Sequence, residues 1–417
     1  MNNILAAREK RSIVLQEINY EINDAIIIKA NIPGSNKNIK VAKILVTIFK
    51  NEVIKQVKVK TIKFYESDDG PFYLLTINKM DNTKLILIKI EEKHPLGRLI
   101  DLDLFTSTSR SIYRSDVGYG SRKCMICDRL AILCVREQKH PTVEVLNFIN
   151  HKVSKYLEEL FYELAFSSIK SELDLEDKFG LVTPTSNGSH GDMDYNLMLS
   201  SLDAVVPGLV KMGMIGYESS NLSDAYKEAK QVGIITEKEM LDITNGVNTY
   251  KGLIFILGLA MISCGYYLSN GLDSDIFKNI QIMTKDVFSE PKYHTFGEYA
   301  YKKYLFTGAR GEAKDGFPTV KKVYEYLQGA TIINNRALHM ALIQALSLSD
   351  DTVLLKRAGS MEKYQYFKNL ISSIKVYDIK TIKKITKQCI DNNISCGGAA
   401  DILITALFSY KFKKLFW

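Results

Sequence analysis

The sequence predicts a protein of two domains, an N-terminal α+β domain with a largely antiparallel sheet and a C-terminal all-α domain. The chain has 417 residues, which exceeds the size at which a single hydrophobic core stops growing. Short runs of β-branched and aromatic residues lie within the first 105 residues, whereas apolar residues beyond about residue 150 recur at helical spacing. No linker rich in proline, glycine or serine separates the two parts, so we expect domains of residues 1–152 and 153–417.

The elements of the first domain follow from the spacing of its apolar residues. Apolar residues at helical spacing among charged ones predict helices, and alternation between turn clusters such as Asp68-Asp69-Gly70 predicts strands. The expected elements are helix 1–22, strand 25–30, helix 38–51, strands 57–65, 71–78 and 84–90, a strand that contains Asp101 and Asp103, and helix 141–176.

Composition restricts the class of protein without fixing its partner. The net charge of +8, from 55 basic and 47 acidic residues, suits phosphate-rich small molecules and acidic proteins as well as nucleic acid. The N-terminus becomes charged at once and lacks the apolar core of a signal peptide, so we expect a cytoplasmic protein. The uncharged run 252–272 is the one candidate membrane span, but it is short and contains polar residues, so we expect none.

The first candidate site lies in the run from His94 to Phe105. In a strand, Asp101 and Asp103 share one face, with Cα atoms about 6.5 Å apart, so both carboxylates can hold one divalent cation. Arg98 and His94 precede them, and polyphosphate chemistry needs a metal and a guanidinium to bind the leaving pyrophosphate. The alternative is an exposed strand face with two solvated aspartates.

Three of the six cysteines form a cluster with a histidine. Cys124, Cys127, Cys134 and His140 have the ligand types of a structural zinc site. The later spacings are short for two ligand-bearing turns, and a helix here would place Cys127 and Cys134 on one face as buried thiols. The sequence leaves zinc and buried thiols open.

The second domain contains several polar clusters bracketed by glycine. The run from Gly246 to Gly252 opens directly into an apolar helix, where Asn248 and Thr249 are suitable caps and Lys251 adds a positive charge. This arrangement predicts a phosphate-binding helix N-terminus, although a capped core helix with a solvated lysine has the same sequence. The other clusters contain Lys178, Gly188, His190, Asp192, Arg310, Glu312, Asp351, Thr352, Arg357 and Asp401.

These motifs together resemble two known families. The run His94-Pro-Leu-Gly-Arg98-Leu-x-Asp101-x-Asp103, the Arg122-x-Cys124-x-x-Cys127 and Cys134-x-Arg136-x-x-x-His140 motifs, and Arg8-Glu9-x-Arg11 resemble the apo-citrate lyase phosphoribosyl-dephospho-CoA transferases. The similarity covers about the first 150 residues. Residues 155–410 resemble the triphosphoribosyl-dephospho-CoA synthases through Gly-Val-Asn-Thr-x-Lys-Gly and Thr-Gly-Ala-Arg-Gly-Glu-Ala.

The resemblance implies a bifunctional enzyme that makes and attaches the citrate lyase prosthetic group. ATP and 3′-dephospho-CoA would be joined with release of adenine, and the phosphoribosyl-dephospho-CoA group would then pass to a serine of the acyl carrier (gamma) subunit with release of pyrophosphate. Magnesium is the expected cofactor, and neither nucleic acid nor membrane is an expected partner. In the first domain, Arg98, Asp101 and Asp103 are the expected catalytic residues, His94 binds substrate, and the two aspartates hold the metal.

In the second domain, the resemblance gives the following hypotheses. Asn248, Thr249 and Lys251 bind the triphosphate, Arg310 binds a phosphate, Asp192 and Asp351 hold magnesium, and Glu312 is the base, with His190 as the alternative base. Lys178, Gly188, Thr352 and Arg357 complete the substrate-binding residues.

The sequence departs from the synthase pattern at Phe179, Thr183, Tyr250, Val353 and Ala358. Thr183 replaces an expected carboxylate, for which Asp194 is a candidate substitute if that carboxylate holds metal. A rival hypothesis follows from these departures: a non-catalytic nucleotide- or RNA-binding regulator that kept the scaffold after losing activity.

Overall fold

The computed structural model describes residues 2–108, 110–289 and 296–416, and it divides into two compact units. The first unit is formed mainly by residues up to Leu157 and the second mainly by residues from Glu158. The division falls inside the long helix α5 (Thr142–Leu173), which fulfils the helix predicted over 141–176.

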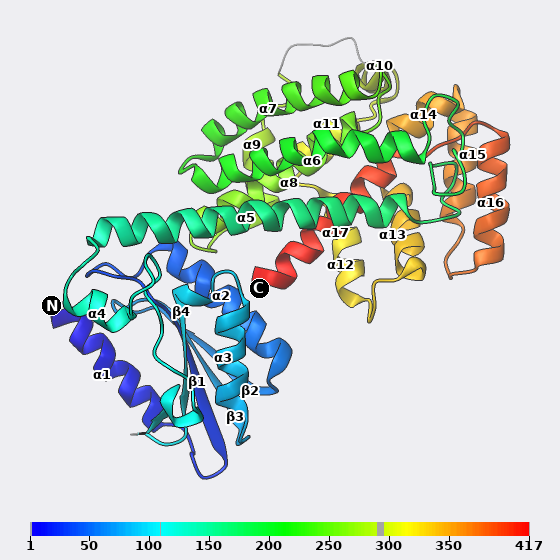
Figure 1. The fold of residues 1–417 in the computed structure, drawn as a ribbon. Helices are drawn as coiled ribbons and strands as arrows, with labels where there is room; N and C mark the ends of the chain where they lie inside the picture. The colour runs from blue at the N-terminus through cyan, green and yellow to red at the C-terminus, as the bar shows by residue number, and fades with distance from the viewer. Residues whose placement is uncertain (1, 109, 290–295, 417) are drawn as a thin grey trace. The chain divides into compact units, whose positions relative to one another are not determined.

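The first unit contains one five-stranded antiparallel sheet, which confirms the predicted fold class of this domain. The sheet has the order β2-β3-β1-β4-β5. Figure 1 shows α1 on one side of this sheet and α2 with α3 on the other. The elements are α1 (Asn2–Gln16), β1 (Asn23–Ala30), α2 (Lys40–Gln56), β2 (Val59–Tyr65), β3 (Phe72–Asn78), α3 (Thr83–Lys93), β4 (Ile100–Phe105), β5 (Ser111–Ile112) and α4 (Ala131–Arg136).

The two faces of the sheet have different roles. Leu102 and Leu104 of β4 are buried, whereas Asp101 is half-buried and Asp103 is exposed, so the predicted alternation is correct. Across the ladder between β1 and β4, Asp101 lies opposite Lys29 and Asp103 opposite Ile27. Ile27 packs with Leu15 of α1, so the aspartates lie on the face of the sheet that α1 partly covers.

One predicted strand is wrong. Residues 84–90 lie within helix α3, where Leu87, Ile88 and Glu91 are buried. Leucines and isoleucines fill nearly every position of this segment, so the pattern fits a buried strand or a helix equally well. The helix places Glu91 beside β4, because the Glu91 carboxylate accepts a hydrogen bond from the backbone N–H of Leu102 at 3.0 Å.

The second unit is all-α over its described residues, as predicted. Helices α6 and α8 pack most extensively against each other, α7 packs on both, and most of α8 is buried. The helices after α5 are α6 (Tyr195–Glu218), α7 (Leu222–Ile243), α8 (Lys251–Ser269), α9 (Ile276–Thr284), α10 (Phe296–Tyr304), α11 (Gly308–Lys314), α12 (Pro318–Gly329), α13 (Asn335–Leu348), α14 (Thr352–Ala358), α15 (Met361–Ser372), α16 (Ile379–Asp391) and α17 (Gly397–Phe416).

Two of these helices, α6 and α8, have the length and apolar composition of membrane-spanning helices within the described part of the chain. Most of the apolar segment of each is buried inside the protein. Burial in the core of the second unit accounts for their composition without a membrane.

Candidate active sites

Charged side chains gather around β4 in the first unit, and such groups are what polyphosphate chemistry needs. Arg122 forms ion pairs with both Asp101 and Glu91 and donates to the carbonyl oxygen of Ile100 at 3.0 Å. Arg114 pairs with Glu91 at 3.0 Å. Burial opposes the charge on Arg122, but Glu91 and Asp101 raise the pKa of this guanidinium above its usual value.

Arg98 and Asp103 belong to the same group of charges. Burial lowers the pKa of Arg98, with a further contribution from Arg122, and the Arg98 guanidinium donates to the carbonyl oxygen of Lys123. Protein atoms around the Asp103 carboxylate raise its pKa, and repulsion from Asp101 adds to the effect, although the residue remains open to solvent. The structure therefore brings together Arg98, Asp101 and Asp103 as predicted.

The sequence did not assign roles to Glu91, Arg114 and Arg122. Glu91 was missed because its segment was predicted to be a strand, and a helix ending in Glu91-Glu92 is the signal that could have found it. Arg122 stands in the motif that begins the cysteine cluster, but its spacing from Asp101 gave no indication of contact.

A second charged cluster lies on the same face of the sheet. The Asp69 carboxylate is fully buried and contacts Arg8 at 3.4 Å, Arg11 at 2.9 Å, Lys37 at 3.4 Å, and Lys29. Burial alone would raise the pKa of Asp69, but the hydrogen bonds from Lys29 and Arg11 hold it far below its usual range. Four cations around one carboxylate leave an excess of positive charge, and Lys29 lies opposite Asp101.

His94, the predicted substrate-binding residue of this domain, has contacts typical of a structural residue. Its Nδ1 accepts a hydrogen bond from the N–H of Leu96 at 3.1 Å, and its ring packs 4.6 Å from Phe49 and 5.2 Å from Tyr156. Burial lowers the pKa of His94. These contacts hold the turn between α3 and β4.

The cysteine cluster does not have the helical form that would make it a row of buried thiols. Helix α4 contains Cys134 but not Cys127, which lies in a turn before it. The ligand atoms of Cys124, Cys127, Cys134 and His140 all lie within 4.8 Å of one another, the one such group of three or more His, Cys, Asp or Glu ligands among the described residues.

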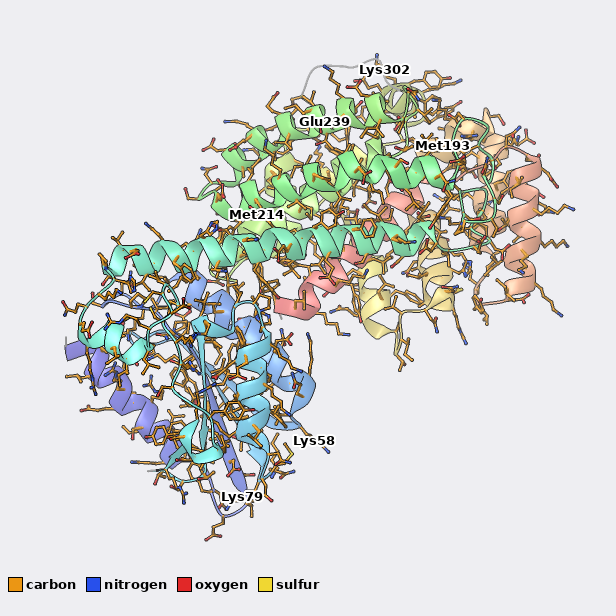
Figure 2. All side chains as sticks on the ribbon, viewed as in Figure 1. Lys58, Lys79, Met193, Met214, Glu239 and Lys302 are labelled. Atoms are coloured by element: carbon orange, nitrogen blue, oxygen red, sulfur yellow. The ribbon has the colours of Figure 1, made fainter. Side chains whose placement is uncertain are left out.

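The candidate site of the second unit consists of two adjoining cavities of about 540 and 390 Å³. Gly252, Thr352, Val353 and Asp401 line both. Met193, labelled in Figure 2 just before α6, lines the larger cavity. Most of the predicted residues are in these linings: Lys178, His190, Asp192, Asn248, Thr249, Lys251, Thr352 and Arg357 in the larger, and Glu312, Asp351 and Thr352 in the smaller.

The N-terminus of α8 lies at the larger cavity as predicted. Asn248 caps the helix, since its Oδ1 accepts a hydrogen bond from the N–H of Lys251 at 3.1 Å. The Thr249 hydroxyl donates to the Ser201 hydroxyl at 3.0 Å, and Lys251 pairs with Glu237 of α7 while half of its side chain remains exposed. The N-terminal turn of α17 lines the same cavity through Gly397.

Asp401 is the residue that sequence reasoning left without a role. It lines both cavities, and no hydrogen bond among the described residues involves its carboxylate. A Cβ atom on Gly252 would lie 2.2 Å from Asp401 Oδ2, so only glycine permits this approach. Burial raises the pKa of Asp401 well above its usual value, and Asp351 and Glu172 add repulsion.

Lys178 and Gly188 have structural contacts. The Lys178 ammonium donates to the carbonyl oxygens of Glu172 at 2.6 Å and Leu173 at 3.3 Å, and to Glu172 Oε1 at 2.8 Å. All three donors are occupied, so this buried lysine stabilises the C-terminus of α5. A Cβ atom on Gly188 would collide with the carbonyl oxygen of Gly180 at 2.3 Å. Their substrate-binding roles stay predictions: Lys178 lines the larger cavity, and Gly188 is in neither of the two linings.

His190 is held as a neutral imidazole. Arg357 donates to His190 Nδ1 at 2.7 Å and to the Ser189 carbonyl oxygen at 2.6 Å, and His190 Nε2 lies 2.9 Å from the Ser395 hydroxyl. Burial first, and then Arg357, lower the pKa of His190 from 6.5 to about 4. Both ring nitrogens are occupied, so the alternative role of His190 as base is not supported. Asp192 is open to solvent, 3.9 Å from His190 Nδ1.

Two aspartates proposed for magnesium are helix caps. Asp351 is buried, and its carboxylate accepts hydrogen bonds of 2.9 Å from the N–H groups of Val353 and Leu354 in α14 and of Ala399 in α17. Asp194, the candidate substitute, caps α6 by accepting from the N–H of Leu197 at 2.8 Å. An aspartate at a helix start has the same sequence signature whether it caps the helix or binds metal.

Glu312 lines the smaller cavity and also stabilises α12. Its carboxylate accepts hydrogen bonds from the N–H of Thr319 at 3.1 Å and from the Thr319 hydroxyl. Burial raises the pKa of Glu312, and the bonds from Thr319 oppose the rise. Arg310 pairs with Glu298 of α10 at 3.7 Å and is absent from the described lining of both cavities.

Two of the five departures from the family pattern line these cavities. Phe179 and Thr183 are buried, so the replacements are accommodated by packing. Tyr250 lines the larger cavity, and its buried hydroxyl has no hydrogen-bond partner among the described residues. Val353 lines both cavities, whereas Ala358 is buried at the end of α14.

Comparison with known proteins matches both parts of the chain. Residues 159–417 match the family model described as ATP:dephospho-CoA triphosphoribosyl transferase, and residues 1–156 match the model described as apo-citrate lyase phosphoribosyl-dephospho-CoA transferase. Protein CitXG of Leuconostoc mesenteroides subsp. cremoris is 30% identical over 97% of this chain and 95% of its own length.

Two further relatives agree with this division. Protein CitXG of Haemophilus influenzae is 28% identical over 98% of this chain and 96% of its own length. The 2-(5''-triphosphoribosyl)-3'-dephosphocoenzyme-A synthase of Haemophilus ducreyi is 28% identical over 68% of this chain and 98% of its own length.

Proposed function

The chain belongs to the family in which an apo-citrate lyase phosphoribosyl-dephospho-CoA transferase domain precedes an ATP:dephospho-CoA triphosphoribosyl transferase domain, and we propose where each reaction takes place. The second domain makes 2′-(5″-triphosphoribosyl)-3′-dephospho-CoA from ATP and 3′-dephospho-CoA and releases adenine. The first domain transfers the phosphoribosyl-dephospho-CoA group to a serine of the citrate lyase acyl carrier subunit and releases pyrophosphate.

We assign ATP to the two adjoining cavities of the second unit. The observation that carries this assignment is that the N-terminal turns of α8 and α17 line the larger cavity together with Lys251, Lys356 and Arg357. The positive end of a helix dipole at such an N-terminus attracts an anion. The volumes of the cavities suit a nucleotide and part of a second substrate.

In the synthase reaction the 2′-hydroxyl of 3′-dephospho-CoA forms a bond to C1′ of the ATP ribose while the bond from C1′ to adenine breaks. The hydroxyl proton must pass to a base, and the departing adenine gains a proton. We assign the base to Asp401, because it lies where the two cavities adjoin and its carboxylate is not engaged in hydrogen bonds among the described residues. The Glu312 oxygens, by contrast, are engaged by Thr319.

Magnesium fits the charge distribution of this cavity. Burial raises the pKa of Asp401, and repulsion from Asp351 and Glu172 adds to the rise, so a cation near these carboxylates would relieve that repulsion. The exposed Asp192, which lines the larger cavity, would hold the ion together with phosphate oxygens, as magnesium sites with few protein ligands do, and the Asp401 carboxylate would remain available as the base. Bound magnesium neutralises phosphate charge.

The transfer reaction is assigned to the face of the sheet that contains Asp101 and Asp103. The serine oxygen of the carrier forms a bond to the α-phosphorus of the intermediate while the bond from that phosphorus to pyrophosphate breaks. Arg98, Arg122 and the cations around Asp69 would bind the phosphates. Asp101 and Asp103 would hold magnesium against the pyrophosphate.

The proposal includes a cytoplasmic location and no nucleic acid or membrane partner. The burial of most of α6 and α8 supports the part of the proposal that concerns the membrane.

Adenine release from ATP, measured with and without 3′-dephospho-CoA, tests the synthase site. Wild-type protein should release adenine only when both substrates and magnesium are present. Asp401→Asn should reduce the rate by about a hundredfold or more, whereas Glu312→Gln should reduce it less. A folded Asp401→Asn variant with near wild-type kcat would contradict the assignment of the base. Pyrophosphate release on addition of apo acyl carrier subunit tests the transferase site in the same way, with Asp103→Asn as the variant.

A further inference from the structure

Four metal-ligating side chains meet in the segment between β5 and α5. The Sγ atoms of Cys127 and Cys134 are 3.5 Å apart, His140 Nε2 lies 3.4 Å from Cys127 Sγ, and Cys124 Sγ lies within 4.8 Å of the other ligand atoms. In a tetrahedral zinc site with Zn–S bonds of about 2.3 Å, the sulfur atoms lie about 3.8 Å apart. The four atoms therefore already have nearly the separation of zinc ligands.

The backbone between the first two cysteines has the form that supports thiolate ligands. Residues on either side of the Cys124-x-x-Cys127 turn pair as a short hairpin, since the N–H of Cys124 donates to the Arg129 carbonyl oxygen at 2.7 Å and that of Ala131 to Arg122 at 2.9 Å. The N–H of Ile126 points to the Cys124 sulfur at 3.5 Å, and the N–H of Arg129 bonds to the Cys127 sulfur. Such N–H groups stabilise negative charge on sulfur.

A second turn of the backbone brings the last two ligands, Cys134 and His140, to the turn that contains the first two cysteines. Helix α4 supplies Cys134, and it ends at Arg136. Gln138 then adopts a positive φ of 48°, and the N–H of Lys139 donates to the Cys134 carbonyl oxygen at 3.0 Å. The chain therefore turns back, and Cys134 and His140 meet at Cys127. Six residues separate Cys127 from Cys134 and five separate Cys134 from His140, spacings that appeared too short for a zinc site.

His140 is oriented as a metal ligand. Its Nε2 faces the sulfur atoms, and its Nδ1 faces the Glu144 carboxylate at 3.4 Å, one turn into α5. A histidine that ligates metal through one nitrogen almost always donates its other N–H to a carboxylate or carbonyl group, which fixes the ring and its tautomer. A histidine that only fills space in the core does not require a carboxylate at the ring nitrogen opposite the sulfur atoms.

We infer that Cys124, Cys127, Cys134 and His140 bind one structural zinc ion. Three thiolates and an imidazole at tetrahedral separation favour zinc over magnesium, which prefers oxygen ligands. Within the described residues 111–141 there is little regular structure to hold this segment, namely β5, a short 3-10 turn and α4. The zinc site would fix the backbone at Arg122, two residues before the first ligand, and so hold the guanidinium that pairs with Asp101 and Glu91.

Metal analysis of the full-length protein tests the inference independently of either enzymatic activity. Protein made in zinc-supplemented medium and purified without chelators or metal-affinity resin should contain about one zinc ion per chain. Cobalt added after removal of zinc should give the visible absorption of a tetrahedral site and a thiolate charge-transfer band. Glu144→Gln, which leaves all four ligands in place, should weaken zinc binding roughly 10- to 100-fold.

Matched variants separate loss of a ligand from loss of a cysteine. Cys124→Ser and His140→Gln should lower the zinc content, whereas Cys264→Ala, at a buried cysteine of α8, should leave it at that of wild type. Folded wild-type protein with no bound zinc and no tetrahedral cobalt spectrum would overturn the inference. So would a disulfide between Cys127 and Cys134 in protein that was purified anaerobically.

Discussion

Replacing Asp351 with alanine distinguishes between two roles for this residue, a helix cap and a metal ligand. The carboxylate accepts three backbone hydrogen bonds of 2.9 Å, two from α14 and one from α17. Loss of a cap costs about 1 kcal/mol for each helix, and leaving buried N–H groups without an acceptor adds about 1–3 kcal/mol. We therefore expect the variant to lose about 3–5 kcal/mol of stability, which corresponds to a fall in melting temperature of roughly 6–20 °C for a unit of this size.

The assay is thermal unfolding followed by intrinsic fluorescence, with adenine release measured on the same samples below the transition. Asp203→Ala is the matched control, because its carboxyl group is exposed on α6 and is in the lining of neither cavity. The control should melt within about 1 °C of wild type. The reasoning is refuted if Asp351→Ala melts like wild type and loses an activity that excess magnesium restores, since that is the behaviour of a metal ligand.

Four further predictions follow from individual contacts. Asp401→Asn should raise the melting temperature while it lowers adenine release, because burial and its acidic neighbours disfavour the charged carboxylate; a lower melting temperature would argue against this. His190 has a lowered pKa, so the folded state binds its proton less readily than the unfolded state, and stability should fall by roughly 3 kcal/mol as the pH drops from 6.5 to about 4. His190→Gln should remove that part of the acid sensitivity in urea unfolding at several pH values. Lys251→Met should raise the KM for ATP about tenfold or more, whereas Glu237→Gln, which removes only its partner in the ion pair, should leave KM equal or lower. A zinc-selective chelator with magnesium in excess should abolish pyrophosphate release and leave adenine release unchanged; equal loss of both activities would contradict a zinc site confined to the first unit.

The features predicted correctly from the sequence are those that local rules decide. Alternation placed Asp101 and Asp103 on one face of a strand, and the N-cap preference placed Asn248 at the start of α8. Helix α3 was misread because a run that is apolar on nearly every side has no period to distinguish a helix from a strand.

The features that were missed depend on contacts between distant segments. The sequence reveals that Asp351 stands at a helix start, but not that Ala399, 48 positions later, directs its N–H at the same carboxylate. The glycine-bracketed cluster drew attention to Asp401 but gave no role for it, because its exposure to both cavities depends on how α17 packs near Gly252. The short cysteine spacings did not indicate that the four ligand atoms would meet, because the chain reversal at Gln138 depends on a positive φ at a residue that rarely adopts one.

The acidic residues of the synthase cavity would repel a polyanion such as the triphosphate of ATP. Burial raises the pKa of Asp401, and repulsion from Asp351 and Glu172 adds to the rise. The Lys178 ammonium already pairs with Glu172. A triphosphate without a metal would meet these carboxylates, whereas helix N-termini and Lys251 stabilise it from the other elements. A magnesium ion bound near these carboxylates would offset the repulsion and would lower the pKa of Asp401, which favours the charged form that a base requires. On this argument the nucleotide and the metal enter together, and the base becomes active only once both are bound.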